Sequence, residues 1–131
     1  MRQAVITGAC RTAIGDFLGT LKEIHPRELG RIAGTEALRR AGVAPDQVDE
    51  LICGNVIQAG VGGNIGRQIQ AAIGIPWKSP ACTVNQLCAS SMRAMEIGAG
   101  NIMLGKSDIV LVAGVENMSM SPYLLMKGRS G

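Results

Sequence analysis

Residues 80–96 read Pro80-Ala-Cys-Thr-Val-Asn-Gln-Leu-Cys-Ala-Ser-Ser-Met-Arg-Ala-Met-Glu96, a short β-prone segment followed by a helix-forming one. The β-prone segment ends near Val84 and the helical pattern begins near Ala89, so Cys88 is expected at a helix N-terminus. Free backbone N–H groups and the helix dipole favour a thiolate there, and the thiolate is the nucleophilic form of cysteine. The small residues at positions 89–91 leave room for a substrate. The stretch therefore predicts a nucleophile for covalent chemistry, with a packed core cysteine as the alternative.

Strands and helices alternate on both sides of this junction. Apolar runs predict strands at Ala4–Cys10, Leu51–Ile57, Ala81–Val84 and Ile109–Ala113. Helical spacing predicts one helix from Pro26 to a stop at Gly42, a second from Ile65 to a stop at Gly74, and a third after Cys88. With right-handed crossovers, this order predicts an α/β fold, a mostly parallel sheet with covering helices. Because the pattern weakens after Val115, we expect the domain to be truncated.

The composition is that of a folded domain with a hydrophobic core. Hydrophobic residues make up 47% of the 131 residues and charged residues 18%, which argues against disorder. The formal net charge is +3 and no run of basic residues occurs, so we expect no nucleic-acid partner. Apolar stretches such as Ile109–Val115 are too short to cross a bilayer, and Met1–Gly8 has no signal-peptide design. We therefore expect a cytoplasmic protein without a membrane partner.

The four cysteines, at positions 10, 53, 82 and 88, do not predict a metal site. They form no C-x-x-C pair and have no histidine nearby, whereas structural zinc sites need such clusters. Without a signal peptide, free thiols are favoured over disulfides. We expect Cys10, Cys53 and Cys82, on predicted strands or at their ends, to be small buried hydrophobic residues.

Several other features invite a functional interpretation, and for each of them a structural role is favoured. The glycine-rich loop Gly60–Gly66 does not fit the dinucleotide-binding pattern, so we expect a tight turn near an active site or a subunit surface. His25 precedes a helix and is expected to cap it or to lie on the surface. Glu116 is expected to bind backbone amides at a strand end, and Arg11 and Asp16 to lock a loop. No base for the nucleophile is therefore evident, and we expect it outside these 131 residues.

Six blocks of sequence together resemble one known family. They are Arg11–Leu21, Gly54–Gly60, Asn64–Gln68, Val84–Ser90, Ala113–Ser119 and the pair Pro122-Tyr123. In this order the blocks are similar to the amino-terminal portion of a thiolase, an acetyl-CoA C-acetyltransferase-like enzyme. The resemblance implies an incomplete thiolase-like N-terminal domain at residues 1–120 and the start of an inserted loop domain at residues 121–131.

The resemblance also implies a function. Cys88 matches the cysteine that carries an acyl group as a thioester, in an enzyme that forms or cleaves a short-chain 3-ketoacyl-CoA, such as acetoacetyl-CoA from two acetyl-CoA. Coenzyme A thioesters would be the substrates, with no permanently bound cofactor, and the parent enzyme would be a homo-oligomer. The activating histidine, the second cysteine and most coenzyme A-binding residues of the family lie beyond Gly131. We therefore expect this segment alone to be inactive.

Two alternative functions stay open, and the chain differs from the family motifs at two positions. The chain is alternatively part of a non-catalytic thiolase-like scaffold subunit, or of a thiolase that acts on longer or aromatic 3-ketoacyl-CoA. A scaffold has no need of a thiol at a helix N-terminus, so Cys88 favours the enzyme. Family motifs commonly have glycine where this chain has Ser91 and proline where it has Ala13. We expect Ser91 to narrow the space beside the nucleophile, which bears on the size of the substrate.

Overall fold

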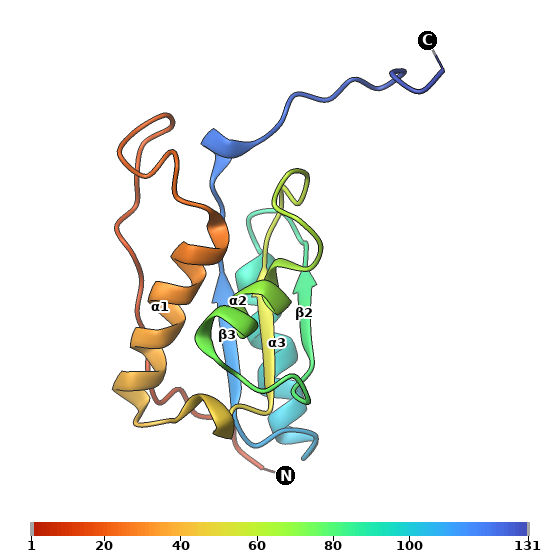
Figure 1. The fold of residues 1–131 in the computed structure, drawn as a ribbon. Helices are drawn as coiled ribbons and strands as arrows, with labels where there is room; N and C mark the ends of the chain where they lie inside the picture. Colours follow the sequence, from red (N-terminus) through yellow and green to blue (C-terminus); the bar gives the residue numbers. More distant parts are fainter. Residues whose placement is uncertain (1, 131) are drawn as a thin grey trace.

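The computed structural model describes residues 2–130, and its centre is a parallel β-sheet (Figure 1). Met1 and Gly131, the outer limits of the two expected domains, lie outside the described residues. The strands are β1 (Glu50–Gly54), β2 (Ala81–Val84) and β3 (Val110–Gly114), in the order β2-β1-β3. They alternate with helices α1 (Pro26–Ala41), α2 (Ile65–Ile73) and α3 (Ser90–Met103), and single 3₁₀ turns lie at Pro45–Gln47 and Met118–Met120. The predicted α/β fold with a parallel sheet is confirmed.

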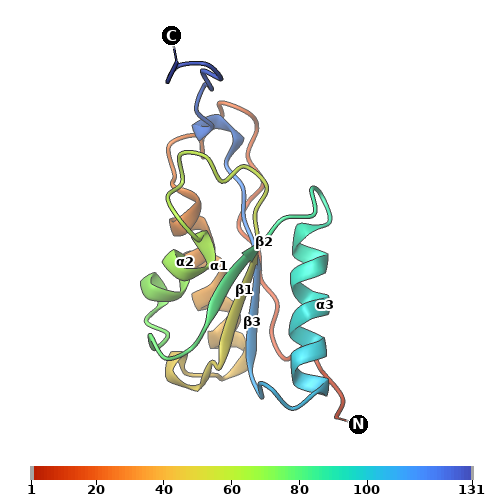
Figure 2. The ribbon, with the colours of Figure 1, turned by 90° about the vertical axis from the view of Figure 1, so that its right-hand side faces the viewer.

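The helices cover both faces of this sheet. Figure 2 shows α1 and α2 on one face and α3 on the other. In the central strand β1, Leu51, Ile52 and Cys53 are fully buried, as is usual for a strand covered on both faces. Leu51 and Cys53 share an apolar cluster with Ile65 and Ile69 of α2. The main core therefore lies between the sheet and the α1–α2 layer.

Local signals set the limits of α1 and α2 as the sequence predicts. Pro26 is the first residue of α1, and Nδ1 of His25 accepts a hydrogen bond from the backbone N–H of Arg27 at 3.1 Å. Gly42 and Gly74 follow the two helices in the left-handed conformation, at φ +66° and +91°. Glycine adopts this conformation without steric cost. The predicted capping role of His25 is confirmed.

The strand β1 is shorter than the sequence predicts, because it ends at Gly54 and not at Ile57. The backbone N–H groups of Val56 and Ile57 donate to the carboxylate of Glu116, at 2.8 and 3.2 Å. A side chain thus replaces the neighbouring strand as hydrogen-bond acceptor at this point. The apolar pattern does not reveal such a change of partner.

The prediction of a strand at Ala4–Cys10 is wrong. This stretch, called the N-terminal segment below, has no strand, and its Val5 and Ile6 are 73% and 75% exposed. Arg40 ties the segment to α1 by donating a hydrogen bond to the carbonyl of Ala9 at 2.9 Å. A strand needs a neighbour for its backbone hydrogen bonds, and no such pairing forms here within residues 2–130.

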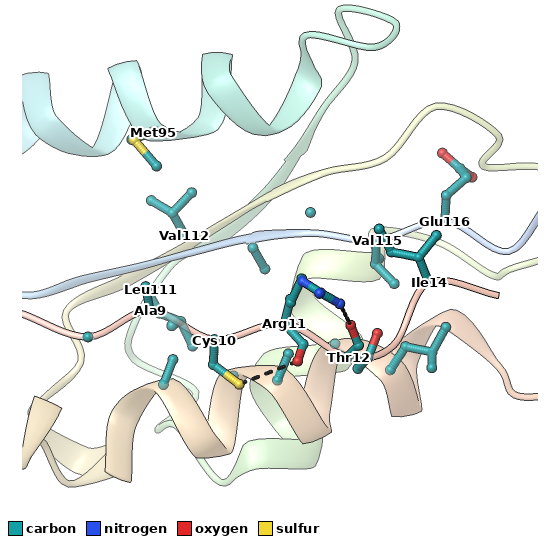
Figure 3. Close-up of a pocket in the computed structure, with 18 of the residues that line it drawn as sticks. Ala9, Cys10, Arg11, Thr12, Ile14, Met95, Leu111, Val112, Val115 and Glu116 are labelled. Carbon is teal, nitrogen blue, oxygen red and sulfur yellow. Dashed lines mark hydrogen bonds between the residues drawn. The ribbon is translucent and has the colours of Figure 1, made fainter. Parts of the chain in front are cut away.

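An apolar cavity of about 1040 Å³ separates the N-terminal segment from β3. We call this cavity the β3 slot; residues 4–17, α1, α3 and β3 line it. Figure 3 shows Val112 of β3 pointing toward Met95 of α3, with Cys10 lying beside α1. The N-terminal segment and β3 line opposite parts of the slot, and no backbone pairing joins them within residues 2–130.

Residues 121–130 lie apart from the layers, and Figure 1 shows them projecting from one end of the molecule. They contain no helix or strand, and Tyr123, Leu125 and Met126 are largely exposed. A domain boundary between residues 120 and 121 stays a prediction. Within residues 2–130, no helix combines the length and the apolar character needed to cross a bilayer.

Candidate functional site

Cys88 lies in the turn that joins β2 to α3, at the carboxyl end of the parallel strands. The helix begins at Ser90, close to the predicted junction, and Cys88 is exposed. The N-cap residue Ala89 supplies no side-chain hydrogen bond to the N–H groups of the first helical turn. Open α/β sheets bind ligands outside the carboxyl ends of their strands, and a helix N-terminus favours negative charge. The turn around Cys88 is therefore the candidate site.

The backbone of this turn is strained and is held by side chains. Leu87, directly before Cys88, has φ +51°, a left-handed conformation that leucine rarely adopts. The Ser90 hydroxyl accepts a hydrogen bond from the N–H of Gln86 at 2.8 Å and donates one to the carbonyl of Leu87 at 2.6 Å. Oδ1 of Asn85 accepts from the N–H of Leu87 at 3.0 Å. Such strain persists where the surroundings enforce it, so Ser90, only 4% exposed, fixes the turn and does not open space for a substrate.

Two glycines bring the start of α3 against the ends of β1 and β3. A Cβ atom at Gly54 would lie 2.5 Å from the backbone nitrogen of Ser91, and one at Gly114 would overlap the hydroxyl of Ser91. Neither glycine can gain a side chain unless the helix moves. Residues far apart in the sequence thus determine where Cys88 stands above the sheet.

Glu116 holds the loop that follows β1. Besides two backbone N–H groups, its carboxylate accepts a hydrogen bond from Nδ2 of Asn55 at 3.0 Å. Nδ2 of Asn55 also donates to the carbonyl of Val115 at 3.0 Å. The predicted structural role of Glu116 is confirmed. Asn55 was not predicted as a site residue, although it belongs to one of the family blocks; it is 1% exposed, and its Oδ1 has no partner within residues 2–130.

The other loops that were singled out have structural roles. Asn64, in the glycine-rich loop, is the N-cap of α2, and its Oδ1 accepts from the N–H of Arg67 at 3.2 Å and from the hydroxyl of Thr83 at 2.8 Å. Nη1 of Arg11 donates to the carbonyl of Thr12 at 2.9 Å. These contacts close turns within the loops or attach them to the sheet.

Two of the other thiols, Cys53 and Cys82, are poorly suited to act as nucleophiles. Burial raises the pKa of Cys53 to about 12, and burial together with the charge of Glu50 raises the pKa of Cys82. Cys53 is buried as predicted, whereas Cys10 and Cys82 are only half-buried. A raised pKa leaves little thiolate near neutral pH. No cluster of three or more His, Cys, Asp or Glu side chains that would suit a metal ion occurs within residues 2–130.

Comparison with known families agrees with this arrangement. Residues 4–131 match the family model described as thiolase, N-terminal domain. The chain belongs to the thiolase family.

Individual thiolases are similar to the chain along nearly its whole length. An acetyl-CoA acetyltransferase of Syntrophomonas wolfei is 44% identical over 130 residues, which are 99% of this chain and 33% of that relative. The cytosolic acetyl-CoA acetyltransferase of Gibberella zeae is 47% identical over 126 residues, 96% of this chain and 32% of the relative. The crystal structure of the Bacillus anthracis acetyl-CoA acetyltransferase is 42% identical with a TM-score of 0.96, covering 100% of this chain and 33% of that one. The chain thus spans about a third of the length of the thiolases that it matches.

Three of the thiolase blocks meet at the candidate site. Gly54–Gly60, Val84–Ser90 and Ala113–Ser119 begin at or next to the carboxyl ends of β1, β2 and β3. Ser91, at the position where the resemblance leads us to expect glycine, packs its side chain against Gly114. The extra hydroxyl therefore lies at the interface between α3 and β3.

Proposed function

We propose that this chain carries the nucleophile of a thiolase that forms or cleaves a short-chain 3-ketoacyl-CoA. The expected reaction is the formation of acetoacetyl-CoA from two acetyl-CoA, or its reverse. The observation that supports the proposal most is the exposed Cys88 on a strained turn at the N-terminus of α3. The names of the relatives, acetyl-CoA acetyltransferases, support the substrate class.

The proposed reaction proceeds through a thioester on Cys88. The Sγ thiolate attacks the carbonyl carbon of an acyl-CoA, and backbone N–H groups at the start of α3 stabilise the negative charge on the carbonyl oxygen. The bond between the acyl carbon and the sulfur of coenzyme A breaks, and coenzyme A leaves as a thiolate that takes up a proton. A second acyl-CoA loses an α-proton to a base. Its carbanion attacks the acyl-cysteine, which forms the new carbon–carbon bond and returns the thiolate of Cys88.

We assign the base to a part of the parent enzyme outside this chain. His25, the only histidine, caps α1, and the carboxylate of Glu116 is occupied by three N–H donors. Burial raises the pKa of Cys53 to about 12, so this thiol is poorly suited to exchange protons at neutral pH. We therefore expect the chain alone to be inactive.

The same proposal covers the organisation of the parent enzyme. Residues 1–120 would be an incomplete N-terminal domain and residues 121–131 the start of an inserted loop domain. The β3 slot supports a longer parent, because its apolar lining offers a surface on which further parts of a thiolase would pack. A homo-oligomeric and cytoplasmic parent is part of the proposal, and the cytosolic relative from Gibberella zeae supports that compartment.

Acetylation of Cys88 tests the proposed function. The chain, extended by the remaining part of the Syntrophomonas wolfei relative, is incubated with acetyl-CoA and its peptides are analysed by mass spectrometry. We expect one acetyl group on Cys88, and Cys88→Ser to lower acyl transfer at least about 10³-fold. Cys82→Ser, which removes a half-buried thiol, is the matched control and should retain activity. The chain without the extension should remain unmodified.

The outcomes separate the alternatives. An acetyl group on another cysteine, or full activity of the Cys88→Ser variant, would contradict the assignment of the nucleophile. A folded extended chain that accepts no acyl group from any acyl-CoA would favour the scaffold. Faster transfer from a longer or aromatic acyl-CoA than from acetyl-CoA would favour the larger substrates.

A further inference from the structure

A cleft between α1 and α2 lies on the face of the molecule opposite α3. Its lining residues are Arg27, Glu28 and Arg31 of α1, Arg67, Gln68, Ala71 and Ala72 of α2, and Trp77. We call it the α1–α2 cleft; its volume is about 580 Å³. The cleft shares no residue with the β3 slot, and the turn around Cys88 does not contribute to it. The thiolase chemistry proposed above makes no use of it.

Trp77 is the most unusual side chain in this cleft. It is the only tryptophan of the chain and is 74% exposed. The guanidinium carbon of Arg67 lies 5.5 Å from the centre of its ring, within the range of a cation–π contact. Nη1 of Arg67 is itself fixed by donating to the carbonyl of Ser79 at 3.0 Å. The indole is therefore held beside a positive charge, with most of its surface open to a further ring.

Positive charge exceeds negative charge in the cleft, which has three arginines and a single carboxylate, Glu28. Arg27 and Arg31 pair with this carboxylate through Nε alone, at 3.2 and 2.8 Å. Within residues 2–130, their Nη groups have no hydrogen-bond partner. The hydrogen bonds from Arg31 and Arg27 hold the pKa of Glu28 below its usual range, so the ionised carboxylate orients both guanidinium groups. The free N–H groups can then donate hydrogen bonds to an anion.

We propose that the α1–α2 cleft binds a nucleotide, with the base stacked on Trp77 and the phosphate held by Arg27 and Arg31. Guanidinium groups bind phosphate oxygens through paired N–H donors, and aromatic side chains stack on nucleobases. The methyl side chains of Ala71 and Ala72 leave space for a flat ring. The volume of about 580 Å³ is in the range of small-molecule sites. An acidic peptide would use the arginines but not the open face of the indole, so the combination favours the nucleotide.

The fluorescence of Trp77 tests this proposal directly, since no other tryptophan contributes. The chain is titrated with ADP, with adenosine and with inorganic phosphate, and free N-acetyl-tryptophanamide corrects for absorption by the ligand. We expect saturable quenching by ADP, with an affinity at least about tenfold higher than for adenosine or phosphate alone, because only ADP uses both halves of the cleft. Added salt should weaken ADP binding.

Variants connect the signal to the cleft. The double variant Arg27→Gln/Arg31→Gln should lower the affinity for ADP at least about tenfold, because it removes the phosphate donors. Arg93→Gln is the matched control, since this arginine also pairs with a glutamate but lies on α3. Circular dichroism checks that all variants fold. Because Trp77→Ala removes the fluorescent side chain, equilibrium dialysis with labelled ADP measures the binding of this variant. Absence of saturation up to about 10 mM ADP, equal affinity for adenosine, or unchanged binding by the double variant would overturn the proposal.

Discussion

The sheet has a closed side around β1 and an open side beyond β3. On the closed side, Leu51 is fully buried, and the start of α3 contacts Gly54 so closely that a Cβ atom there would lie 2.5 Å from a backbone nitrogen. On the open side, a slot of about 1040 Å³ separates β3 from the N-terminal segment, in which Val5 is 73% exposed. The sequences of the two sides are similarly apolar. The difference shows that an apolar run becomes a strand only where a partner for its backbone is within reach.

The largest predicted effect compares one apolar side chain from each side of the sheet. Ile69 of α2 is fully buried against β1, and truncation to alanine should lower the free energy of unfolding by about 4 kcal/mol through lost contacts and a new cavity. The same truncation at Val5, which is 73% exposed, should lower the free energy of unfolding by less than about 0.5 kcal/mol. Urea unfolding followed by circular dichroism measures both variants. A cost above about 1 kcal/mol for Val5→Ala would mean that the N-terminal segment is packed in solution.

The next predicted effect concerns the close contact that positions Cys88. Gly54→Val should lower the free energy of unfolding by about 3 kcal/mol, because the new side chain overlaps the backbone at Ser91 and pushes α3 from the sheet. Gly100→Ala is the matched control, since a Cβ atom there meets nothing within 4 Å. The free energy of unfolding of this variant should rise by about 0.5–1 kcal/mol, because alanine loses less conformational freedom than glycine when the helix forms. Equal unfolding midpoints for the two variants would contradict the contact between α3 and β1.

The comparison of the two sides also explains which elements the sequence predicts. The limits of α1 and α2 depend on Pro26, Gly42 and Gly74, whose effects act within one helical turn. The strand predicted at Ala4–Cys10 depends on a partner for its whole length, and a sequence pattern carries no information about that partner. Local signals are therefore sufficient for the helices and insufficient for the edge of the sheet.

The features of the candidate site likewise fall into those that local sequence predicts and those that depend on the fold. The position of Cys88 before a helix follows from local periodicity, and the capping role of His25 from the proline after it. The roles of Gly54 and Gly114 could not be predicted from the residues, because they arise where β1 and β3 meet the start of α3. The bracing role of Ser90 also depends on the folded turn, in which its hydroxyl bonds to Gln86 and Leu87. Such contacts join positions that only the fold brings together.

The smallest predicted effect concerns the exposed carboxylate of Asp49, which links the amino ends of β1 and β3 and so joins the two sides of the sheet. Oδ2 of Asp49 accepts hydrogen bonds from the N–H groups of Asp108 and Ile109, at 2.8 and 3.0 Å. Asp49→Asn keeps an acceptor but removes the charge. Because charge-assisted hydrogen bonds are stronger than neutral ones and this group is exposed, the loss in the free energy of unfolding at pH 7 should be about 0.5–1 kcal/mol.

The pH dependence of this loss identifies its cause. The hydrogen bonds from the backbone N–H groups of Ile109 and Asp108 hold the pKa of Asp49 in the folded chain below its usual range. A carboxylate with a lowered folded-state pKa stabilises the protein above the unfolded pKa, and this contribution disappears as the pH falls through the folded pKa. The difference between the unmodified chain and Asp49→Asn should therefore be full above about pH 5 and shrink toward pH 2. Other titrating carboxylates are common to both chains and cancel in the difference. Urea unfolding across this pH range measures the stability difference. Asp46→Asn, at an exposed carboxylate, is the control. A difference that stays constant down to pH 2 would show that the lost contact is geometric and does not depend on the charge of Asp49.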